Sequence, residues 1–301
     1  MKSGIPSRWR DYLLESFSGS ADGVPPWVEQ LAEGDDEGYF APGSAVWAVH
    51  GATPVIVAGI RALLMQTLHP GAMAGVHDWS RFREDPMGRL AGTVRWVLTT
   101  SFGSKAGAEQ GSAFVKSLHR RVVGTYSDRS GVEHSYSAAD PELLRWVHVV
   151  FAEAFLSCHQ AWGRRIPGGA DRYVGEWAIA GDLMDVANPP RSEAELRAQL
   201  AAFDDDLVSD ERVAEAVRFI RKPPLPPSLL PGYSLIFAGA VSTLAPRYRR
   251  MLGLRRAWWP ARFATRVALW VLALLLGRPS SSEIYARKRL TRLAADAGRT
   301  K

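Results

Sequence analysis

Cysteine is almost absent from this sequence, in which Cys158 is the single one among 301 residues. An internal disulfide is therefore excluded, and the composition favours a protein of a reducing compartment. The sequence also lacks CxxCH, the motif that attaches c-type haem covalently. Covalent haem of that type is excluded.

The signature motifs of several common enzyme classes are missing too. No HExxH, ExxH, GxxxxGKS/T, GxGxxG or GxSxG occurs in the chain. These absences remove the usual sequence support for zincins, carboxylate-bridged di-iron proteins, P-loop enzymes, dinucleotide-binding enzymes and serine hydrolases. The remaining candidates for catalytic or cofactor-binding residues are the histidines in apolar helical segments.

Long apolar runs are scarce. The uncharged run Val267–Gly277 is shorter than the roughly 20 residues that span a bilayer. Near the N-terminus, charges at Arg8, Arg10, Asp11 and Glu15 interrupt any apolar core of signal-peptide length. We therefore expect a cytoplasmic protein rather than an exported or membrane-spanning one.

Hydrophobic residues make up 47% of the chain and 11 of its residues are tryptophan, which is enough for a sizeable core. We predict a single domain over residues 1–301. The net charge of +6 is unevenly spread, because residues 247–301 carry fourteen Lys or Arg against Glu283 and Asp296. This tryptophan-containing basic stretch is typical either of a surface that meets an anionic membrane or of a solvated tail on a packed helix.

The spacing of apolar residues and the capping signals predict a chain made almost wholly of helices. The sequence His69-Pro70-Gly71 should end or kink one of them. Residues 126–137 are predicted to be a polar loop, and residues 222–233 a proline-rich connector. The predicted helices cover residues 8–17, 27–34, 39–49, 55–68, 86–102, 110–122, 143–162, 173–184, 192–200 and 210–220.

Four segments between Arg61 and Gly124 carry a specific resemblance. They are LLMQTLHPG, HDWSRF, DPMGRLAGT and SLHRRVVG, and they resemble successive landmarks of the rubber oxygenase (latex-clearing protein) and MpaB-type oxygenase family. The segments YFAPGSAVWAVHG and YSAADPELLRWVHVV extend the resemblance less sharply. We place the family core at about residues 39–220, followed by a basic, tryptophan-rich helical extension at about residues 234–301.

Proteins of that family bind b-type haem. The resemblance therefore implies an all-α, globin-like helical bundle around a buried haem pocket, with one haem b (iron protoporphyrin IX) held non-covalently. It also implies an oxidoreductase that activates dioxygen on an apolar small molecule, such as an alkene or isoprenoid chain.

His119 is the first candidate for the iron ligand. From spacing alone, a single histidine on a helix is more commonly a core or surface residue. The resemblance changes this, because the proximal ligand of the rubber oxygenases is the histidine in the segment that SLHRRVVG resembles. Phe114, Leu118 and Val122 should form an apolar wall beside it. His148, in RWVHVV, is the competing ligand, and the alternative for His148 is a core histidine.

Arg89 and Thr93 lie four residues apart, hence on one helical face. The family pattern places such a pair beside the haem, where the arginine would pair with a propionate and the threonine would hydrogen-bond a ligand on iron. These two are the candidate catalytic residues. An ion pair of Arg89 with Glu84 or Asp85 is the alternative. The chain departs from the best-known rubber oxygenases at Gly92, where their pattern has a lysine able to cap the iron.

Lys116, Arg120 and Arg121 bracket His119 within one helical turn, and Lys116 and Arg120 are candidate partners of a haem propionate. Charges on a half-solvated helix would look the same. His69 is interpreted as a structural histidine at a helix end, with its ring bonded to backbone, and His77 as a weaker candidate for the pocket.

The leading hypothesis is therefore a haem b-dependent oxygenase. The alternatives are a non-catalytic haem-binding sensor or carrier, and a helical scaffold that has lost the cofactor. The expected partners are dioxygen, an apolar substrate and a membrane surface met by residues 247–301. No nucleic acid partner is expected, because no recognised nucleic-acid-binding module is present.

Overall fold

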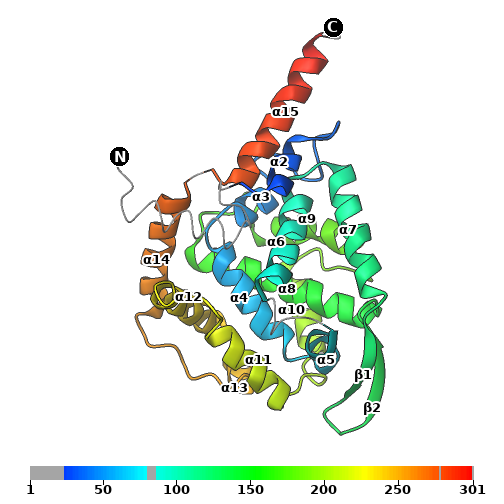
Figure 1. Cartoon of the computed structure of the whole chain (residues 1–301), viewed down its shortest axis with the longest axis vertical. Helices are drawn as coiled ribbons and strands as arrows, with labels where there is room; N and C mark the ends of the chain where they lie inside the picture. The colour runs from blue at the N-terminus through cyan, green and yellow to red at the C-terminus, as the bar shows by residue number, and fades with distance from the viewer. Residues whose placement is uncertain (1–23, 80–85, 278, 300–301) are drawn as a thin grey trace.

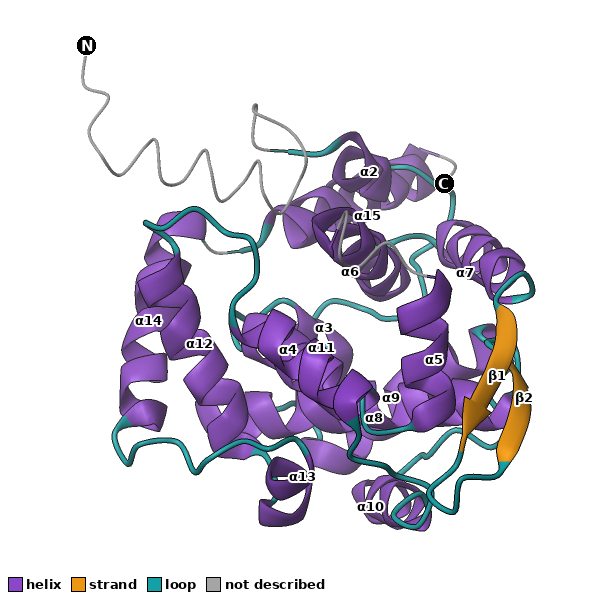
Figure 2. Cartoon of the chain, turned by 60° about the horizontal axis from the view of Figure 1, so that its bottom comes forward, coloured by secondary structure: helices purple, strands orange, loops and turns teal. Residues whose placement is uncertain are grey.

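The computed structural model describes residues 24–79, 86–277 and 279–299, with only the backbone for residues 86–90. The described chain is mostly helical, as predicted, with one small sheet (Figures 1 and 2). Its elements are, in chain order, α2 (Pro26–Glu29), η1 (Gln30–Ala32), α3 (Ala45–His50), α4 (Val55–Gln66), α5 (Pro70–Trp79), α6 (Pro86–Phe102), α7 (Lys105–His119), β1 (Val123–Ser127), β2 (Glu133–Ser137), α8 (Pro141–Trp162), α9 (Gly169–Leu183), α10 (Glu193–Ala202), α11 (Glu211–Arg221), α12 (Leu230–Thr243), α13 (Pro246–Met251), α14 (Ala261–Leu276) and α15 (Ser281–Arg299).

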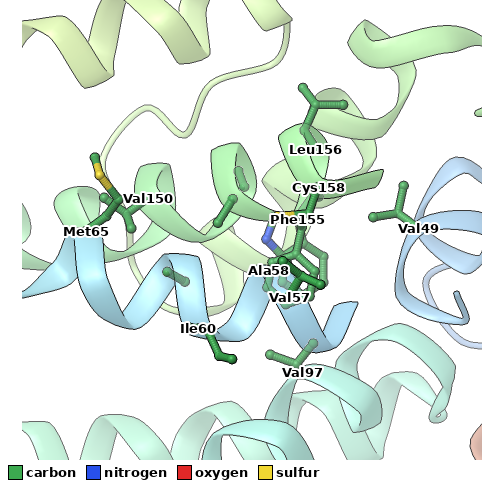
Figure 3. Packing of buried hydrophobic residues seen from close by; sticks show 14 of the residues in the cluster. Val49, Val57, Ala58, Ile60, Met65, Val97, Val150, Phe155, Leu156 and Cys158 are labelled. Atoms are coloured by element: carbon green, nitrogen blue, oxygen red, sulfur yellow. The ribbon is translucent and has the colours of Figure 1, made fainter. Parts of the chain in front are cut away.

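Helix α8 forms the centre of the core, as its almost uniformly apolar sequence predicts. Trp146, Val149 and Val150 on this helix are completely buried. Helix α4 lies along α8, and Figure 3 shows Val57 of α4 and Phe155 of α8 meeting in the seam between them. Close packing of such apolar surfaces is the main stabilising contribution to the fold.

Side chains that accept hydrogen bonds from backbone amides fix several helix starts. Ser44 caps α3, Ser192 caps α10 and Asp210 caps α11. Asp140 differs. Helix α8 begins at Pro141, two residues before its predicted start, and the Asp140 carboxylate accepts from the backbone amide of Ser137 at 2.7 Å instead of capping the helix.

The sequence His69-Pro70 produces a sharp turn, as predicted. Helix α4 ends at Gln66, α5 begins at Pro70, and the two helices are bent by 103°. The residue before proline avoids helical angles, which ends the first helix and lets the second leave in a new direction. Helix α5 thereby runs toward the β-hairpin instead of continuing along α8 (Figure 1).

The predicted polar loop at residues 126–137 is wrong, because strands β1 and β2 pair there as an antiparallel hairpin. Each strand carries a tyrosine: Tyr126 lies on β1 and the buried Tyr136 on β2. Aromatic side chains favour pleated, half-buried strands, and the polar residues between them obscured this signal. The Asp128 carboxylate accepts from the backbone amides of Ser130 and Val132 and so closes the turn.

Several other boundaries also differ from the predictions, and α3 begins at Ala45, six residues after its predicted start. Helix α7 begins at Lys105, five residues earlier than expected, because Ser104 caps it by accepting from the amide of Gly107. The proline-rich connector is shorter than predicted, since α12 begins at Leu230 and carries Pro231 in its first turn. Proline is tolerated there because its missing N–H has no helical partner in any case.

Arg289 of α15 ties the end of the described chain to its beginning. Its guanidinium is buried, and it donates to the carbonyl oxygen of Leu31 at 2.6 Å and of Phe102 at 2.9 Å. Helix α15 therefore packs on η1 and on the C-terminal end of α6.

Within the described residues, no single helix is long and apolar enough to cross a membrane. Two helix pairs, α4 with α5 and α14 with α15, meet the length and composition only when each pair is taken together across its bend. The helix predicted at residues 8–17 and the proposed partners Glu84 and Asp85 lie outside the described residues.

A buried ion pair joins α4 to α8. The Arg61 guanidinium contacts the Glu153 carboxylate through two nitrogens and also donates to the Thr243 hydroxyl at 3.1 Å. We expect Glu153→Ala to lower the free energy of unfolding by about 3 kcal/mol, because it leaves the Arg61 charge buried and unpaired. Urea unfolding measures the change. Arg218→Ala, in an exposed pair with Glu211, is the matched control and should cost less than about 1 kcal/mol. Equal losses for the two variants would contradict the assignment.

Candidate functional site

A large, partly open apolar cavity is lined by residues of most of the helices, among them α4, α6, α7, α8, α12 and α14. Its volume is about 2,420 Å³, whereas small-molecule pockets are usually roughly 300–1,000 Å³. Most of the residues that line it are aliphatic or aromatic. A cavity of this size has room for a flat macrocycle together with a second apolar molecule.

His119 lies in the wall of this cavity, at the C-terminal end of α7. Its Nδ1 is buried and has no hydrogen-bond partner among the described residues. Burial lowers the pKa of the imidazole below its usual value, because the charged form loses its hydration. The ring is therefore neutral at pH 7 and retains nitrogen lone-pair capacity, which is the form of histidine that binds iron.

The apolar wall predicted beside His119 is present, but it faces the cavity instead of the packed core. Phe114 is 65% exposed and Leu118 is 41% exposed, and both line the cavity together with Val122. Large apolar side chains this exposed are costly in water. An apolar group in the cavity would cover them.

His148 lines the same cavity from α8 and is almost completely buried. Burial lowers its pKa to about 4, so this ring is also neutral at pH 7. One edge of the ring packs on the backbone of α9: a Cβ atom added to Gly181 would lie 3.0 Å from His148 Cε1 and 3.2 Å from Nε2. The Nε2 edge thus faces α9. The two candidate ligands lie on different helices around one cavity.

His50, which the sequence analysis did not single out, also lines the cavity. Its Nδ1 lies 2.6 Å from the Ser101 hydroxyl and its Nε2 lies 3.0 Å from the Tyr173 hydroxyl. Ser101 donates its only hydroxyl proton to the carbonyl of Val97, so it must accept from His50 Nδ1. His50 therefore accepts from Tyr173 at Nε2.

Both nitrogens of His50 are thus hydrogen-bonded, and burial lowers its pKa to about 3. His50 is a neutral, fixed part of the wall and has no free nitrogen for iron. Its segment was noticed for its resemblance, but no spacing signal marked the residue.

Two further buried polar groups line the cavity without a hydrogen-bond partner among the described residues. They are the Tyr136 hydroxyl and the Trp177 indole nitrogen. Buried polar atoms normally have partners.

Helix α6 contributes the predicted arginine and threonine. Thr93 lines the cavity. Arg89 lies one turn earlier on the same helix, and its side chain is outside the described residues. Gly92 also lines the cavity, and a Cβ atom added there would meet no atom within 4 Å in the described part of the chain. The position that holds lysine in the family pattern is therefore open.

Lys116 and Arg120 are not among the described residues that line the cavity. The Lys116 ammonium lies 3.0 Å from the carboxylate of Asp185, and Arg120 is exposed beyond the end of α7. Thr93, His119 and His148 thus all line the same extended cavity, and Lys116 has a partner on the protein itself. The propionate roles of Lys116 and Arg120 stay predictions.

The other two predicted histidines lie away from this space. His69 is buried among Tyr126, Trp146 and Phe203, and its Nδ1 has no hydrogen-bond partner within the described residues. His77 is partly exposed, with Nδ1 2.9 Å from the Asp78 carboxylate.

Comparison with protein families gives one match. The model described as "ER-bound oxygenase mpaB/B′/Rubber oxygenase, catalytic domain" matches residues 47–277. The chain belongs to this family. The matched region contains the whole of the resemblance between Arg61 and Gly124, and it continues through α12 and α14, beyond the core that we placed at residues 39–220. No match is found among curated proteins or among solved structures.

The residues present fit the haem that the mpaB/rubber oxygenase family implies. The cavity is apolar and large, its wall holds a neutral His119 with an unpartnered nitrogen, and the exposed Phe114 and Leu118 of the same helix also line it. An axial imidazole, a dry pocket and flat apolar walls are what a non-covalent haem requires.

Proposed function

We propose that this member of the mpaB/rubber oxygenase family is a haem b-dependent oxygenase acting on an apolar substrate, with His119 as the iron ligand. The observation that supports this most directly is the unpartnered, neutral His119 in the wall of a cavity of about 2,420 Å³. Family membership supports the oxygenase class.

His119 would hold the haem, with Arg89 as a partner for a propionate and Thr93 as a hydrogen-bond donor inside the pocket. The haem would supply the activation of dioxygen, which no protein side chain provides. The chain's own contribution is to exclude water and to orient the substrate. Phe114, Leu118 and Val122 keep the wall apolar, so an alkene or isoprenoid chain binds there without desolvation of polar groups.

The three histidines of the cavity would remain uncharged under working conditions. Burial lowers the pKa of His50 to about 3 and that of His148 to about 4, and it also lowers that of His119. A neutral wall suits an apolar substrate, because a buried imidazolium would have to be paired or hydrated.

An absorption spectrum of the purified protein, expressed with haem precursor supplied, tests the proposal. A strong Soret band, with about one b-type haem per chain by pyridine haemochrome, is the supporting result. A colourless protein that also fails to take up added haemin would overturn it. Oxygen consumption with apolar alkenes then separates an oxygenase from a haem-binding sensor or carrier.

Gly92 allows the open side of the cavity to be tested. We expect Gly92→Lys to reduce the affinity of the loaded protein for added cyanide or imidazole at least tenfold, because the new amine would compete with the added ligand for the iron. Titration followed by the Soret band measures the affinity. Gly92→Ala, which adds no amine, is the control. Equal behaviour of the two variants would contradict the placement of Gly92 beside the iron.

A further inference from the structure

Helix α14 presents an apolar face to the outside of the molecule. Phe263 is 70% exposed, Val267 45%, Trp270 63% and Leu274 64%. These residues follow one another at spacings of three or four, so they lie on one side of the helix. Trp258 and Trp259, just before the helix, extend the surface at 53% and 93% exposure. We call these six residues the α14 outer face.

The opposite side of α14 is fixed to the protein. Thr265 is completely buried and donates to the carbonyl oxygen of Leu235 at 3.0 Å. A Cβ atom added to Gly239 of α12 would lie 2.6 Å from Thr265, so the two helices approach closely at this point. Leu269 is also buried. The outward orientation of Trp270 and Leu274 is therefore set by packing.

Arginines border the α14 outer face. Arg255, Arg256, Arg262 and Arg266 have no carboxylate partner among the described residues, and residues 255–277 contain no Asp or Glu. The Arg262 and Arg266 side chains donate to the carbonyl oxygens of Ser242 and Ala161, both at 3.2 Å. These bonds hold the two guanidinium groups along one flank of the helix.

Helix α14 also borders the cavity that contains His119. Val271 and Leu272 line that cavity, and so do Phe263 and Val267, which also belong to the α14 outer face. The same short helix thus carries the outer face and part of the cavity wall. Figures 1 and 2 show α14 at one edge of the molecule, with the β-hairpin at the opposite edge.

We propose that the α14 outer face docks in the plane of an anionic phospholipid bilayer and places the cavity next to the lipid. Tryptophan is enriched at membrane interfaces, and arginine beside an apolar helix face is attracted by anionic headgroups. The further step, that a lipid-dissolved apolar substrate enters the cavity along α14, rests on the proposed function.

Charge favours lipid over a second copy of the chain as the occupant of this face. In a twofold dimer each copy would present the same surface, so the arginines of residues 255–266 would face each other, and residues 255–277 supply no acidic side chain to offset them. An anionic bilayer offers apolar depth for Trp270 and Leu274 and negative charge for the flanking arginines.

The first experiment is co-sedimentation of the full chain with vesicles of phosphatidylcholine alone or with added phosphatidylserine. Binding should be stronger to the anionic vesicles and should weaken with salt by about fivefold for each arginine that loses its contact. The double variant Trp270→Asp/Leu274→Asp should reduce binding more than tenfold. Val132→Asp, at a residue that is 54% exposed on the hairpin, is the matched control and should bind as the original does. Failure of the full chain to bind anionic vesicles, or equal loss for both variants, overturns the proposal.

The second experiment identifies what covers the face. Cys158 is completely buried, so a spin label can be directed to Leu274→Cys or, as control, to Val132→Cys. The label at position 274 should be water-accessible in solution and should enter the apolar phase with anionic vesicles, while that at position 132 stays in water. Shielding at position 274 without vesicles overturns the proposal. Shielding that grows with protein concentration then points to a second copy, and shielding independent of concentration points to another segment of the same chain.

Failure here and failure of the proposed function are distinguishable. Vesicle binding needs neither haem nor turnover, while the Soret band needs no membrane. A haem-loaded protein that does not bind vesicles would support the haem proposal and overturn the docking proposal.

Discussion

His119→Ala yields a protein that retains no stoichiometric haem while its helical content stays near that of the original chain. The neutral His119 ring lines the cavity and its buried Nδ1 has no hydrogen-bond partner among the described residues, and removal of an iron ligand would leave only packing to hold the haem. The fold should survive, because His119 ends α7 and its neighbours Phe114 and Leu118 are exposed. Pyridine haemochrome measures the haem, and far-ultraviolet circular dichroism measures the helix.

The matched control is His148→Ala, which removes the competing candidate ligand on α8 and should keep most of the haem. Adding imidazole to His119→Gly should restore part of the Soret band, because the free ligand can occupy the space of the missing ring. If His119→Ala keeps its haem and His148→Ala loses it, the iron ligand lies on α8 and our assignment is wrong.

Mild acid should unfold the haem-free protein far more readily than its carboxylates alone would explain. His50, His69 and His148 are buried, and desolvation lowers their pKa values to about 3, about 4 and about 4. In the unfolded chain each titrates near pH 6.5. Below that pH the unfolded state binds protons at these histidines and the native state does not. Their contribution to the free energy of unfolding is therefore fully present above pH 6.5 and is lost as the pH decreases toward 4. The loss is about 2 kcal/mol per histidine at pH 5, or about 6 kcal/mol for the three.

Urea unfolding of the haem-free protein at pH 7 and pH 5 measures this loss. His69→Phe should reduce it by about 2 kcal/mol, because the new ring sits among Tyr126, Trp146 and Phe203 and does not titrate. At pH 8 the variant should show no pH dependence different from that of the original. An unchanged loss at pH 5 in His69→Phe would mean that His69 is protonated in the folded protein.

Periodicity and local capping predicted most of the helices, because both are properties of short stretches. Helix α8 is apolar on nearly every side, and Ser44 and Ser192 cap the helices that follow them. The hairpin was not predicted, because a two-stranded sheet depends on pairing between strands, and the polar residues of β1 and β2 resemble those of a loop. The outward turn of Trp270 could not be predicted, since burial of the opposite face of α14 is decided by α12.

The residues of the candidate site also divide into those that local sequence predicted and those that depend on distant residues. Thr93 and His119 were found through a resemblance to short motifs, and both line the cavity. His50 was missed because its role depends on Ser101 and Tyr173, which are 51 and 123 residues away along the chain. The ion pair of Lys116 with Asp185 was equally invisible, because 69 residues separate the two. Local sequence predicts helices and caps, but it does not predict which distant side chain will hydrogen-bond or pair with a given residue.

The buried Arg289 has a consequence for how the molecule is made. Its guanidinium binds carbonyl oxygens that lie 258 and 187 residues earlier in the chain. A ribosome adds about 5–20 residues each second. Arg289 is therefore synthesised about ten seconds or more after η1 and the end of α6. During that interval the nascent chain has those carbonyl groups open to water. The junction can close only when α15 has emerged, which makes this closure a late event of synthesis.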